Sequence, residues 1–578
     1  MKNIIDIKTN KELIEIAKMY EKYNQRFLIK DLNDYINASL VGGESKYFGK
    51  VCCLFGLRRT GKTTMMYQAI LDMNEKQQRK TAFINVTKRN SMIDVYNELK
   101  QLKRNGYQYV FIDEITKAED FIDVSGLLSD IYVTSGMHIV ITGTDSLGIY
   151  ISKKEELFDR TVMLHTTYIP FYEYQHLFPN SHVDDYIENG GLLSKSGSNY
   201  NEDLDVHEYV DEAIAQNIQH SLKYVNDRAT WGSLMEFYAN NELTGLINRV
   251  IEDKNHLFSL HLIYNDFISN DMRTLFKLLL KKISENNLFD YLTNVDRIFI
   301  DNTIKDKLEI HSVNQFKSKI DSNVITQVET YLYKLDVIDY IDTLIVQKEI
   351  TTQNNPVIVQ PAIRFNQAKI DVETLYKENE FNQLIQEKQN HIIDKLMTEI
   401  KGRMLEEIIL LDTTRAYRGN KKFKVYKMCF HEYKNSPFAN GEFDMVIQDP
   451  KGNLSLFEIK HSSEVQYDSQ TKHLNDSKKL KYLESRGFTI KNKFVLYNGQ
   501  TKEKDENDIQ YVNVGDYLKS LGKFDHRTID FKEKENTKEN PIYVVDAKEE
   551  TSYIVEVKEE NKKMEYNTSK KHQHDEVE

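Results

Sequence analysis

One stretch, residues 56–64, constrains the fold of this chain more than any other feature. It reads GLRRTGKTT, follows the apolar run VCCLF and precedes the helix-patterned segment TTMMYQAIL. The spacing matches G-x-x-x-x-G-K-[ST], a pattern in which a strand ends in a glycine-rich loop and the loop opens a helix. The sequence therefore predicts a strand, a loop and a helix in this order.

A loop of this kind binds the phosphates of a nucleotide. Its glycines let backbone N–H groups turn inward, and the following helix adds its positive end. Lys62 supplies a point charge at the β- and γ-phosphates, and the Thr63 hydroxyl suits Mg²⁺. We therefore expect ATP and Mg²⁺ as cofactors. The residues expected to surround the phosphates are Gly56, Leu57, Arg58, Arg59, Thr60, Gly61, Lys62, Thr63 and Thr64.

A second element supports this interpretation. The run YVFIDE ends a predicted strand with Asp113 and Glu114. Asp113 suits water-mediated coordination of Mg²⁺, and Glu114 suits polarising the water that attacks the γ-phosphate. The two elements together correspond to Walker A and Walker B motifs and predict an ATPase.

Two further residues are candidates with open alternatives. HIVITGT ends in Thr142 and Thr144, and the choice between the two stays open; the one taken as the candidate, Thr142, either senses the γ-phosphate or is an ordinary strand-end hydroxyl. Arg160, in LFDRTVML, either stabilises charge during hydrolysis or forms a surface salt bridge with Asp159 or another nearby acid. If Arg160 acts across a subunit interface, the protein is a homo-oligomer.

The whole chain is too long for a single core. Its 578 residues favour three or four domains. Between residues 46 and 175, short apolar runs alternate with helical patterns, which predicts an α/β fold with a parallel sheet. The domains expected along the chain are a helical lead-in (1–45), a P-loop ATPase domain (46–175), a helical lid or linker (176–270), a winged helix-turn-helix (271–350), an α/β nuclease-like domain (390–522) and a flexible charged tail (523–578).

Bulk composition restricts the partners. The formal net charge of −12 provides no global attraction for nucleic acid, so contact with DNA or RNA requires a local basic patch. Cys52, Cys53 and Cys429 have neither metal-ligand spacing nor a disulfide framework, which fits a reducing compartment. No run of 18 apolar residues occurs, so we expect a cytoplasmic protein without a membrane partner.

The winged helix-turn-helix is predicted from HSVNQFKSKIDSNVITQVETYLYKLDVIDYIDTL. Such a module either reads DNA or packs against its own chain. Its second helix carries Glu329 and Thr330, and Lys334 is its only basic residue. DNA-reading helices usually offer more Arg, Lys or Asn, so we favour the structural role.

A hairpin in the C-terminal third, GEFDMVIQDPKGNLSLFEIKH, carries a second candidate site. Residues 449–453 form a strong turn, and pairing of the two strands can bring Asp444 to the face of Glu458 and Lys460. Two carboxylates there suit Mg²⁺ or Mn²⁺, and Lys460 suits stabilisation of charge on a phosphate. An exposed structural hairpin is the alternative, since the tail repeats the pattern at Asp546, Glu556 and Lys558.

The motifs together resemble a family. FGLRRTGKTT, YVFIDEI, IVITGTDS and FDRTVMLHTTYIPFYEY occur in the order typical of bacterial and archaeal AAA-type P-loop ATPases of the ASCE class. In that family the C-terminal domain, formally of unknown function, resembles PD-(D/E)XK nucleases. GRMLEEIILLD, GEFDMVIQD and SLFEIKHSSE are similar to its motifs. The resemblance implies that Glu406 is a helical acid supporting the metal. The basic residues expected to face phosphates are Arg415, Arg418, Lys421, Lys422 and Lys424, with Lys478, Lys479, Lys481 and Arg486 on the far side.

The leading functional hypothesis is an ATPase whose nucleotide state controls a metal-dependent nuclease-like domain acting on DNA or RNA. An ATP-dependent switch or scaffold, with a C-terminal domain that binds a partner or nucleic acid without cutting, is the main alternative. A DNA-binding regulator that works through the winged helix is the third.

Overall fold

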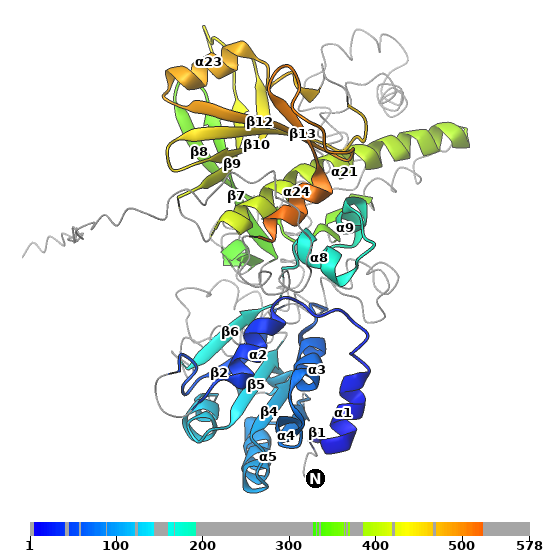
Figure 1. Ribbon diagram of the computed structural model, residues 1–578, viewed down its shortest axis with the longest axis vertical. Helices are drawn as coiled ribbons and strands as arrows, with labels where there is room; N and C mark the ends of the chain where they lie inside the picture. Colours follow the sequence, from blue (N-terminus) through cyan, green and yellow to red (C-terminus); the bar gives the residue numbers. More distant parts are fainter. Residues whose placement is uncertain are drawn as a thin grey trace, which may run out of the picture. The chain divides into compact units, whose positions relative to one another are not determined.

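The described residues of the computed structural model of this 578-residue chain form two β-sheets (Figure 1). Among the described residues, no helix combines the length and apolar character that a membrane crossing requires. Three predicted segments lie wholly or partly outside the described residues. They are the lid after residue 191, the winged helix up to residue 326 and the tail after residue 523. The structure describes residues 5–40, 45–56, 59–87, 89–118, 120–121, 125–143, 160–166, 168–191, 327–330, 332–333, 337–362, 364–365, 368–369, 385–418, 422–465 and 470–523.

The first sheet has six strands in the order β1-β3-β4-β5-β2-β6. All neighbouring strands pair in parallel except β1, which is antiparallel to β3. The four inner strands β2 to β5 are mostly buried apolar runs because a parallel sheet is covered on both faces. Their bounds are β1 Asp6–Thr9, β2 Val51–Phe55, β3 Thr81–Asn85, β4 Tyr109–Asp113, β5 His138–Gly143 and β6 Thr161–His165.

Helices and short helical turns connect these strands. Capping boxes define two of the helix starts: Asn74 with Gln77 for α4, and Ser91 with Asp94 for α5. The helical elements are α1 Asn10–Lys18, α2 Ile29–Asn37, α3 Lys62–Asp72, α4 Glu75–Gln78, α5 Met92–Arg104, η1 Ile115–Lys117, η2 Leu128–Val133, α8 Phe171–Leu177 and α9 Val183–Asn189.

The segment before residue 46 is part of the first sheet's core. The predicted helical lead-in contains β1 as well as α1 and α2, and it buries Leu13, Leu32 and Tyr35 in the same apolar cluster as β2 to β5. Helices α1 and α2 both contact α3, the helix that follows the P-loop. The lead-in therefore positions the P-loop helix.

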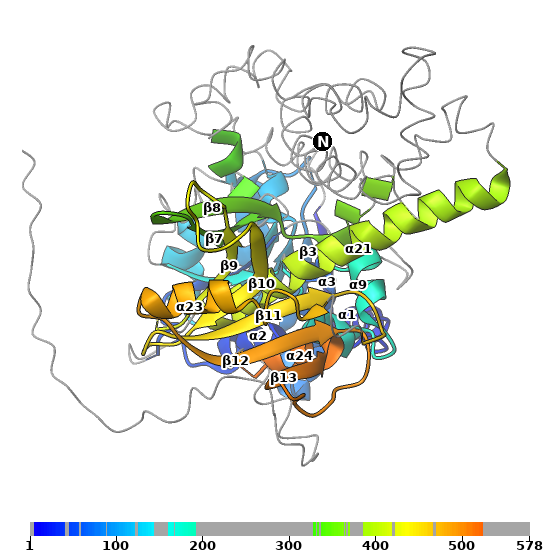
Figure 2. The ribbon, with the colours of Figure 1, turned by 90° about the horizontal axis from the view of Figure 1, so that it is seen from above.

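The second sheet has seven strands in the order β13-β12-β11-β10-β9-β7-β8 (Figure 2). The long helix α21 packs against β7, β9, β10 and β11. The elements are β7 Ile338–Val346, β8 Ile350–Ile358, α21 Gln386–Tyr417, β9 Lys424–Phe430, β10 Gly441–Gln448, β11 Asn453–Lys460, α23 Ser477–Ser485, β12 Thr489–Tyr497, β13 Ile509–Asn513 and α24 Val514–Leu521.

Strand β7 lies in the range predicted as a winged helix, 271–350, but it belongs to this second sheet. It forms a hairpin with β8 and pairs in parallel with β9. The predicted start of the C-terminal domain, residue 390, therefore falls after two strands of its sheet. A wing and a sheet hairpin have the same local pattern, and the long-range pairing with β9 distinguishes them.

The hairpin of β10 and β11 has the predicted turn. The Asp449 carboxylate accepts hydrogen bonds from the Lys451 and Asn453 N–H groups at 2.9 and 2.8 Å. Gly452 has φ +85°, a left-handed conformation that glycine adopts without strain. The strands pair Met445 with Phe457, and continuing this antiparallel register by one residue sets Asp444 opposite Glu458.

Candidate functional site

The P-loop connects β2 to α3, as the sequence predicts. Gly61 has φ +86° and is followed by Lys62, the first residue of α3. The Lys62 side chain is buried, and its Nζ donates to the Gly56 carbonyl at 2.9 Å. Leu57 and Arg58 lie outside the described residues. The loop thus directs its lysine across its own backbone, the region where phosphates bind in loops of this type.

Asp113 joins the P-loop to the neighbouring strand ends. One of its carboxylate oxygens accepts from the Thr63 hydroxyl at 2.9 Å. The other accepts a short hydrogen bond from the Thr142 hydroxyl, and Thr142 in turn accepts from the Glu114 N–H at 3.0 Å. Burial, followed by the neighbouring Glu114, raises the pKa of Asp113. The structure therefore brings Thr63, Asp113, Glu114 and Thr142 together.

The oxygen atoms of Thr63 and Asp113 form a donor set that suits a hard cation such as Mg²⁺. Asp113 ends the parallel strand β4, and Thr63 lies in the first turn of α3, the helix that follows the P-loop. Thr64 follows in the first turn of α3.

Glu114 has an unusual backbone. Its φ of 55° and ψ of 38° lie in the left-handed region, which residues other than glycine, asparagine and aspartate rarely adopt. Such strain costs on the order of 1–3 kcal/mol and clusters at functional sites. The Glu114 carboxylate is 19% exposed and lies 3.9 Å from Lys117 Nζ. This placement leaves the carboxylate within reach of solvent at the strand end.

Arg160 lies where the parallel strands β2 and β6 begin, at the end of the sheet opposite to the P-loop. Its carbonyl accepts from the Val51 N–H at the start of β2, whereas the P-loop follows the end of β2. The guanidinium donates to Asp130 at 2.9 Å, and both side chains are nearly half exposed. The structure does not bring Arg160 to Lys62 of the same chain, and the observed contact is the surface salt bridge that was the alternative.

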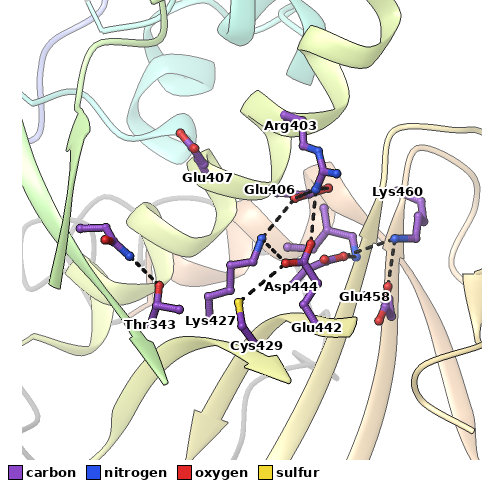
Figure 3. Close-up of polar contacts among 12 residues, drawn as sticks. Thr343, Arg403, Glu406, Glu407, Lys427, Cys429, Glu442, Asp444, Glu458 and Lys460 are labelled. Carbon is purple, nitrogen blue, oxygen red and sulfur yellow. Dashed lines mark hydrogen bonds and ion pairs between the residues drawn. The ribbon is translucent and has the colours of Figure 1, made fainter. Parts of the chain in front are cut away.

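The second candidate site lies at the hairpin of β10 and β11 (Figure 3). The Asp444 carboxylate accepts from the Ile459 N–H at 2.7 Å. Lys460 Nζ lies 3.4 Å from Asp444 and 2.9 Å from Glu458, and both carboxylates are at most 3% exposed. The pairing of β10 with β9 is irregular between Phe443 and Val446. A bulge of this kind re-aims side chains, and Asp444 is one of the residues affected.

Two more carboxylates complete the cluster. Oxygen atoms of Glu406, Glu442 and Asp444 lie within 4.8 Å of one another, the one such three-residue group among the described residues. Glu406 comes from α21 and points toward Asp444, whereas the adjacent Glu407 lies apart (Figure 3). Glu442 was not predicted, although its position two residues before Asp444 places both on one face of β10.

Two cations, also not predicted, neutralise part of this charge. Arg403 lies 3.0 Å from Glu406 and 3.4 Å from Glu442. Lys427 of β9 lies 2.9 Å from Glu442 and 4.0 Å from Glu406. The spacing of Arg403 and Glu406, one helical turn apart, was the available signal for the first pair.

The cluster alters the acidity of its members. Burial and the nearby Asp444 raise the pKa of Glu406 to about 7 and raise that of Glu458 well above its usual value. Burial alone would raise the pKa of Glu442, but Lys427 and Arg403 together outweigh it and lower this pKa to about 2. The carboxylates of one site therefore differ widely in their affinity for protons, as is common at functional sites.

The residues present fit a divalent cation. Four carboxylates converge from α21, β10 and β11, and Glu458 Oε1 is buried without a hydrogen-bond partner among the described residues. A buried carboxylate oxygen of this kind requires a cation or a donor. Glu406, Glu442, Asp444 and Glu458 are the residues that would hold it.

The predicted basic patch is only partly present. Arg415 and Arg418 pair with the buried Asp339 of β7 at 2.7 and 2.9 Å. Lys479 is 1% exposed, with its Nζ 3.0 Å from His473 Nδ1. Arg415 and Lys479 are largely buried and support the domain internally, whereas Arg418 pairs with Asp339 and keeps about half of its side chain exposed. Lys421 lies outside the described residues.

Comparisons with known proteins bear on the first site. No curated protein matches this chain. Among solved structures, the Aeropyrum pernix ORC1 protein in complex with DNA is 12% identical, with a TM-score of 0.23, and the match covers 64% of this chain and 98% of that chain. A TM-score this low does not establish a shared fold. Residues 49–175 match the family described as an AAA domain. This part of the chain is therefore similar to AAA-type ATPases, and its P-loop and Asp113 suit nucleotide binding and hydrolysis.

Proposed function

We propose that this protein hydrolyses ATP and that its nucleotide state controls a metal-dependent nuclease-like site acting on DNA or RNA. The observation that most strongly supports ATP hydrolysis is the pair of hydrogen bonds that Thr63 and Thr142 donate to Asp113. These contacts join the P-loop helix to two strand ends. They hold hydroxyl and carboxylate oxygens where Mg²⁺ and the γ-phosphate are handled in ATPases with this loop.

Each residue has a distinct task in this proposal. Lys62 exchanges its contact with the Gly56 carbonyl for the phosphates, because a charged donor prefers an anion to a neutral carbonyl. Thr142 orients Asp113 and the Glu114 backbone. Glu114 accepts the proton of the attacking water, a role that typically contributes about 10²–10⁴-fold to a rate.

The second site would act on a phosphodiester. A bound Mg²⁺ or Mn²⁺ supplies positive charge to phosphate oxygens and increases the acidity of water. Ile459 N–H and Lys460 fix Asp444, so that its carboxylate faces the group formed with Glu406 and Glu442. Lys460 also offers its charge to a phosphate at the rim, since its side chain is 31% exposed.

A non-cleaving switch or scaffold is the second candidate function. Arg403 and Lys427 already pair with Glu406 and Glu442. Cations in these positions compete with a metal for the same oxygens, which favours a domain that binds a partner or nucleic acid without cutting it.

ATP binding and turnover test the first half of the proposal. We expect Lys62→Ala to lose tight binding of ATP. We expect Glu114→Gln to keep binding and to lose at least about 100-fold in turnover, because an amide does not accept the proton. A wild-type rate in Glu114→Gln contradicts the assignment of the base.

Cleavage assays test the second half. Purified protein is incubated with single- and double-stranded DNA and RNA, with Mg²⁺ or Mn²⁺, with and without ATP. Asp444→Asn or Glu458→Gln should abolish cleavage and retain ATP hydrolysis, whereas Asp546→Ala in the tail is the matched control. Nucleotide control appears as a difference between wild type and Lys62→Ala. Binding of nucleic acid without cleavage under every condition supports the non-cleaving switch.

A further inference from the structure

Arg26 is a buried cation that lies outside residues 49–175, the range similar to AAA domains. It precedes α2 and is 2% exposed. A buried charge is costly unless it is paired and fully hydrogen-bonded. The partners of Arg26 therefore show which parts of the fold it holds together.

One side of the guanidinium binds helix α8. Nε and Nη2 donate to the two carboxylate oxygens of Glu173, each at 3.0 Å. Glu173 is fully buried and also accepts from the Phe27 N–H at 3.0 Å. This bidentate geometry fixes the orientation of the guanidinium plane.

The other side binds three backbone carbonyls. Nη1 donates to Thr60 at 3.0 Å and makes a short hydrogen bond to Thr166, and Nη2 donates to Tyr168 at 2.9 Å. With the two bonds to Glu173, all five N–H donors of Arg26 are used. A lysine cannot reproduce this set, because it offers three donors from one point.

The contact with Thr60 acts on the P-loop itself. Thr60 precedes Gly61, whose φ of +86° shapes the loop just before α3. In a trans peptide unit the C=O and the next N–H point in opposite directions. Since Arg26 holds the Thr60 carbonyl on one side, the Gly61 N–H is directed to the other side, as a loop that cradles phosphates with its amides requires.

We propose that Arg26 is a positioning residue of the nucleotide site, which orients the peptide between Thr60 and Gly61 and ties the P-loop to α8 through Glu173. This inference rests on the proposed ATP-binding function. It assigns a role in nucleotide affinity to a residue of the N-terminal segment whose contact with the P-loop is a hydrogen bond to the Thr60 backbone carbonyl.

A set of three variants tests it, with ADP and ATP affinity measured by calorimetry and stability measured by chemical denaturation. Arg26→Met alone leaves Glu173 buried without its cation and should destabilise the protein strongly. The double variant Arg26→Met/Glu173→Leu replaces the pair with apolar side chains, which often restores stability. Arg26→Lys keeps the charge opposite Glu173 without the fork of donors.

The positioning role predicts that affinity and stability separate. The double variant and Arg26→Lys should bind ATP at least about tenfold more weakly than wild type even where stability is recovered, which corresponds to one charge-assisted hydrogen bond. Tyr35→Phe is the matched control. It removes a hydroxyl whose proton is shared between the carbonyls of Lys50, just before β2, and Ile139 of β5, and it should lower stability without changing affinity.

The outcomes separate this inference from the function on which it rests. If wild type binds no nucleotide, the proposed function fails. If wild type binds and the double variant binds equally well, Arg26 has only a structural role and the inference is overturned. If the double variant does not fold, Arg26→Lys provides the test. Wild-type affinity for ATP in Arg26→Lys also overturns the inference.

Discussion

Replacing Lys460 with methionine tests whether the carboxylates of the C-terminal site are held in place by a compensating charge. Lys460 Nζ is 3.4 Å from Asp444 and 2.9 Å from Glu458, and both acids are at most 3% exposed. Methionine has a similar length without the charge, so the change removes the ammonium and keeps much of the packing.

The magnitude follows from burial. Removing one partner of a buried ion pair costs about 3–5 kcal/mol, because the remaining charge is left uncompensated. Lys460 itself is 31% exposed, and water near its ammonium screens part of the interaction. We therefore expect the lower end, a loss of about 3 kcal/mol in the free energy of unfolding of this domain in the absence of divalent metal.

Urea unfolding of the full chain, followed by a tyrosine or backbone signal, measures this loss in EDTA and in MgCl₂. The ion supplies positive charge at Asp444 and Glu458, so Mg²⁺ should stabilise Lys460→Met more than it stabilises wild type. The matched control is Lys504→Met, which breaks a 2.7 Å pair with the exposed Asp508. Exposed pairs contribute about 0–1 kcal/mol and should show no dependence on metal.

Two results would refute this reasoning. If Lys460→Met unfolds at the wild-type urea concentration in EDTA, the two acids are neutral or hydrated and no charge needs compensation. If Mg²⁺ stabilises wild type and Lys460→Met equally, the ion does not bind beside these carboxylates, and the metal assignment for the cluster is wrong.

Four further predictions concern single side chains. Thr142→Val should lower ATP turnover about tenfold with little change in affinity, because Asp113 loses a charge-assisted hydrogen bond; steady-state kinetics compared with nucleotide binding measures this. Arg160→Ala should leave turnover within about twofold of wild type, since a pair this exposed contributes little; a loss that grows with protein concentration would indicate action across a subunit interface. Gly452→Ala should lower the free energy of unfolding by about 1–2 kcal/mol, because its φ of +85° disfavours a side chain, with ATP turnover unchanged. Burial lowers the pKa of His138. The contribution of this group to stability is therefore present above its unfolded pKa and is lost as pH falls through its folded pKa. Below pH ~6.5 the free energy of unfolding, measured by urea denaturation, should fall less steeply with pH in His138→Gln than in wild type.

The P-loop site can be predicted from the sequence because the patterns that specify it lie within short segments of the chain. The glycine pattern predicts the loop between β2 and α3, and the acids of YVFIDE follow their own strand directly. In a parallel sheet every carboxyl end lies at the same edge, so residues just after strands meet. The same rule argues against Arg160, which precedes its strand and therefore lies at the opposite edge.

The C-terminal site can be predicted only in part from the sequence, because its residues come from four separate elements, α21, β9, β10 and β11. The hairpin register, which sets Asp444 opposite Glu458, follows from the turn and the alternation of the strands. Lys427 enters through the pairing of β9 with β10, and this pairing contains a bulge that no local pattern specifies. The same difficulty explains β7, whose partner β9 is distant in the sequence.

The charges of the C-terminal cluster bear directly on which of its two candidate functions is correct. Four carboxylates, those of Glu406, Glu442, Asp444 and Glu458, share the site with three cations, those of Arg403, Lys427 and Lys460. When all are ionised, the site carries one net negative charge, and a divalent ion is attracted far less than by four unpaired carboxylates. The pKa of Glu406, raised by burial and Asp444 to about 7, weakens that attraction further near neutral pH, because a proton competes for the same oxygens. Strong metal binding therefore requires Arg403 or Lys427 to move away from Glu406 and Glu442. A cleaving enzyme would need a ligand or nucleotide state that releases these cations, whereas a binding domain can keep them in place.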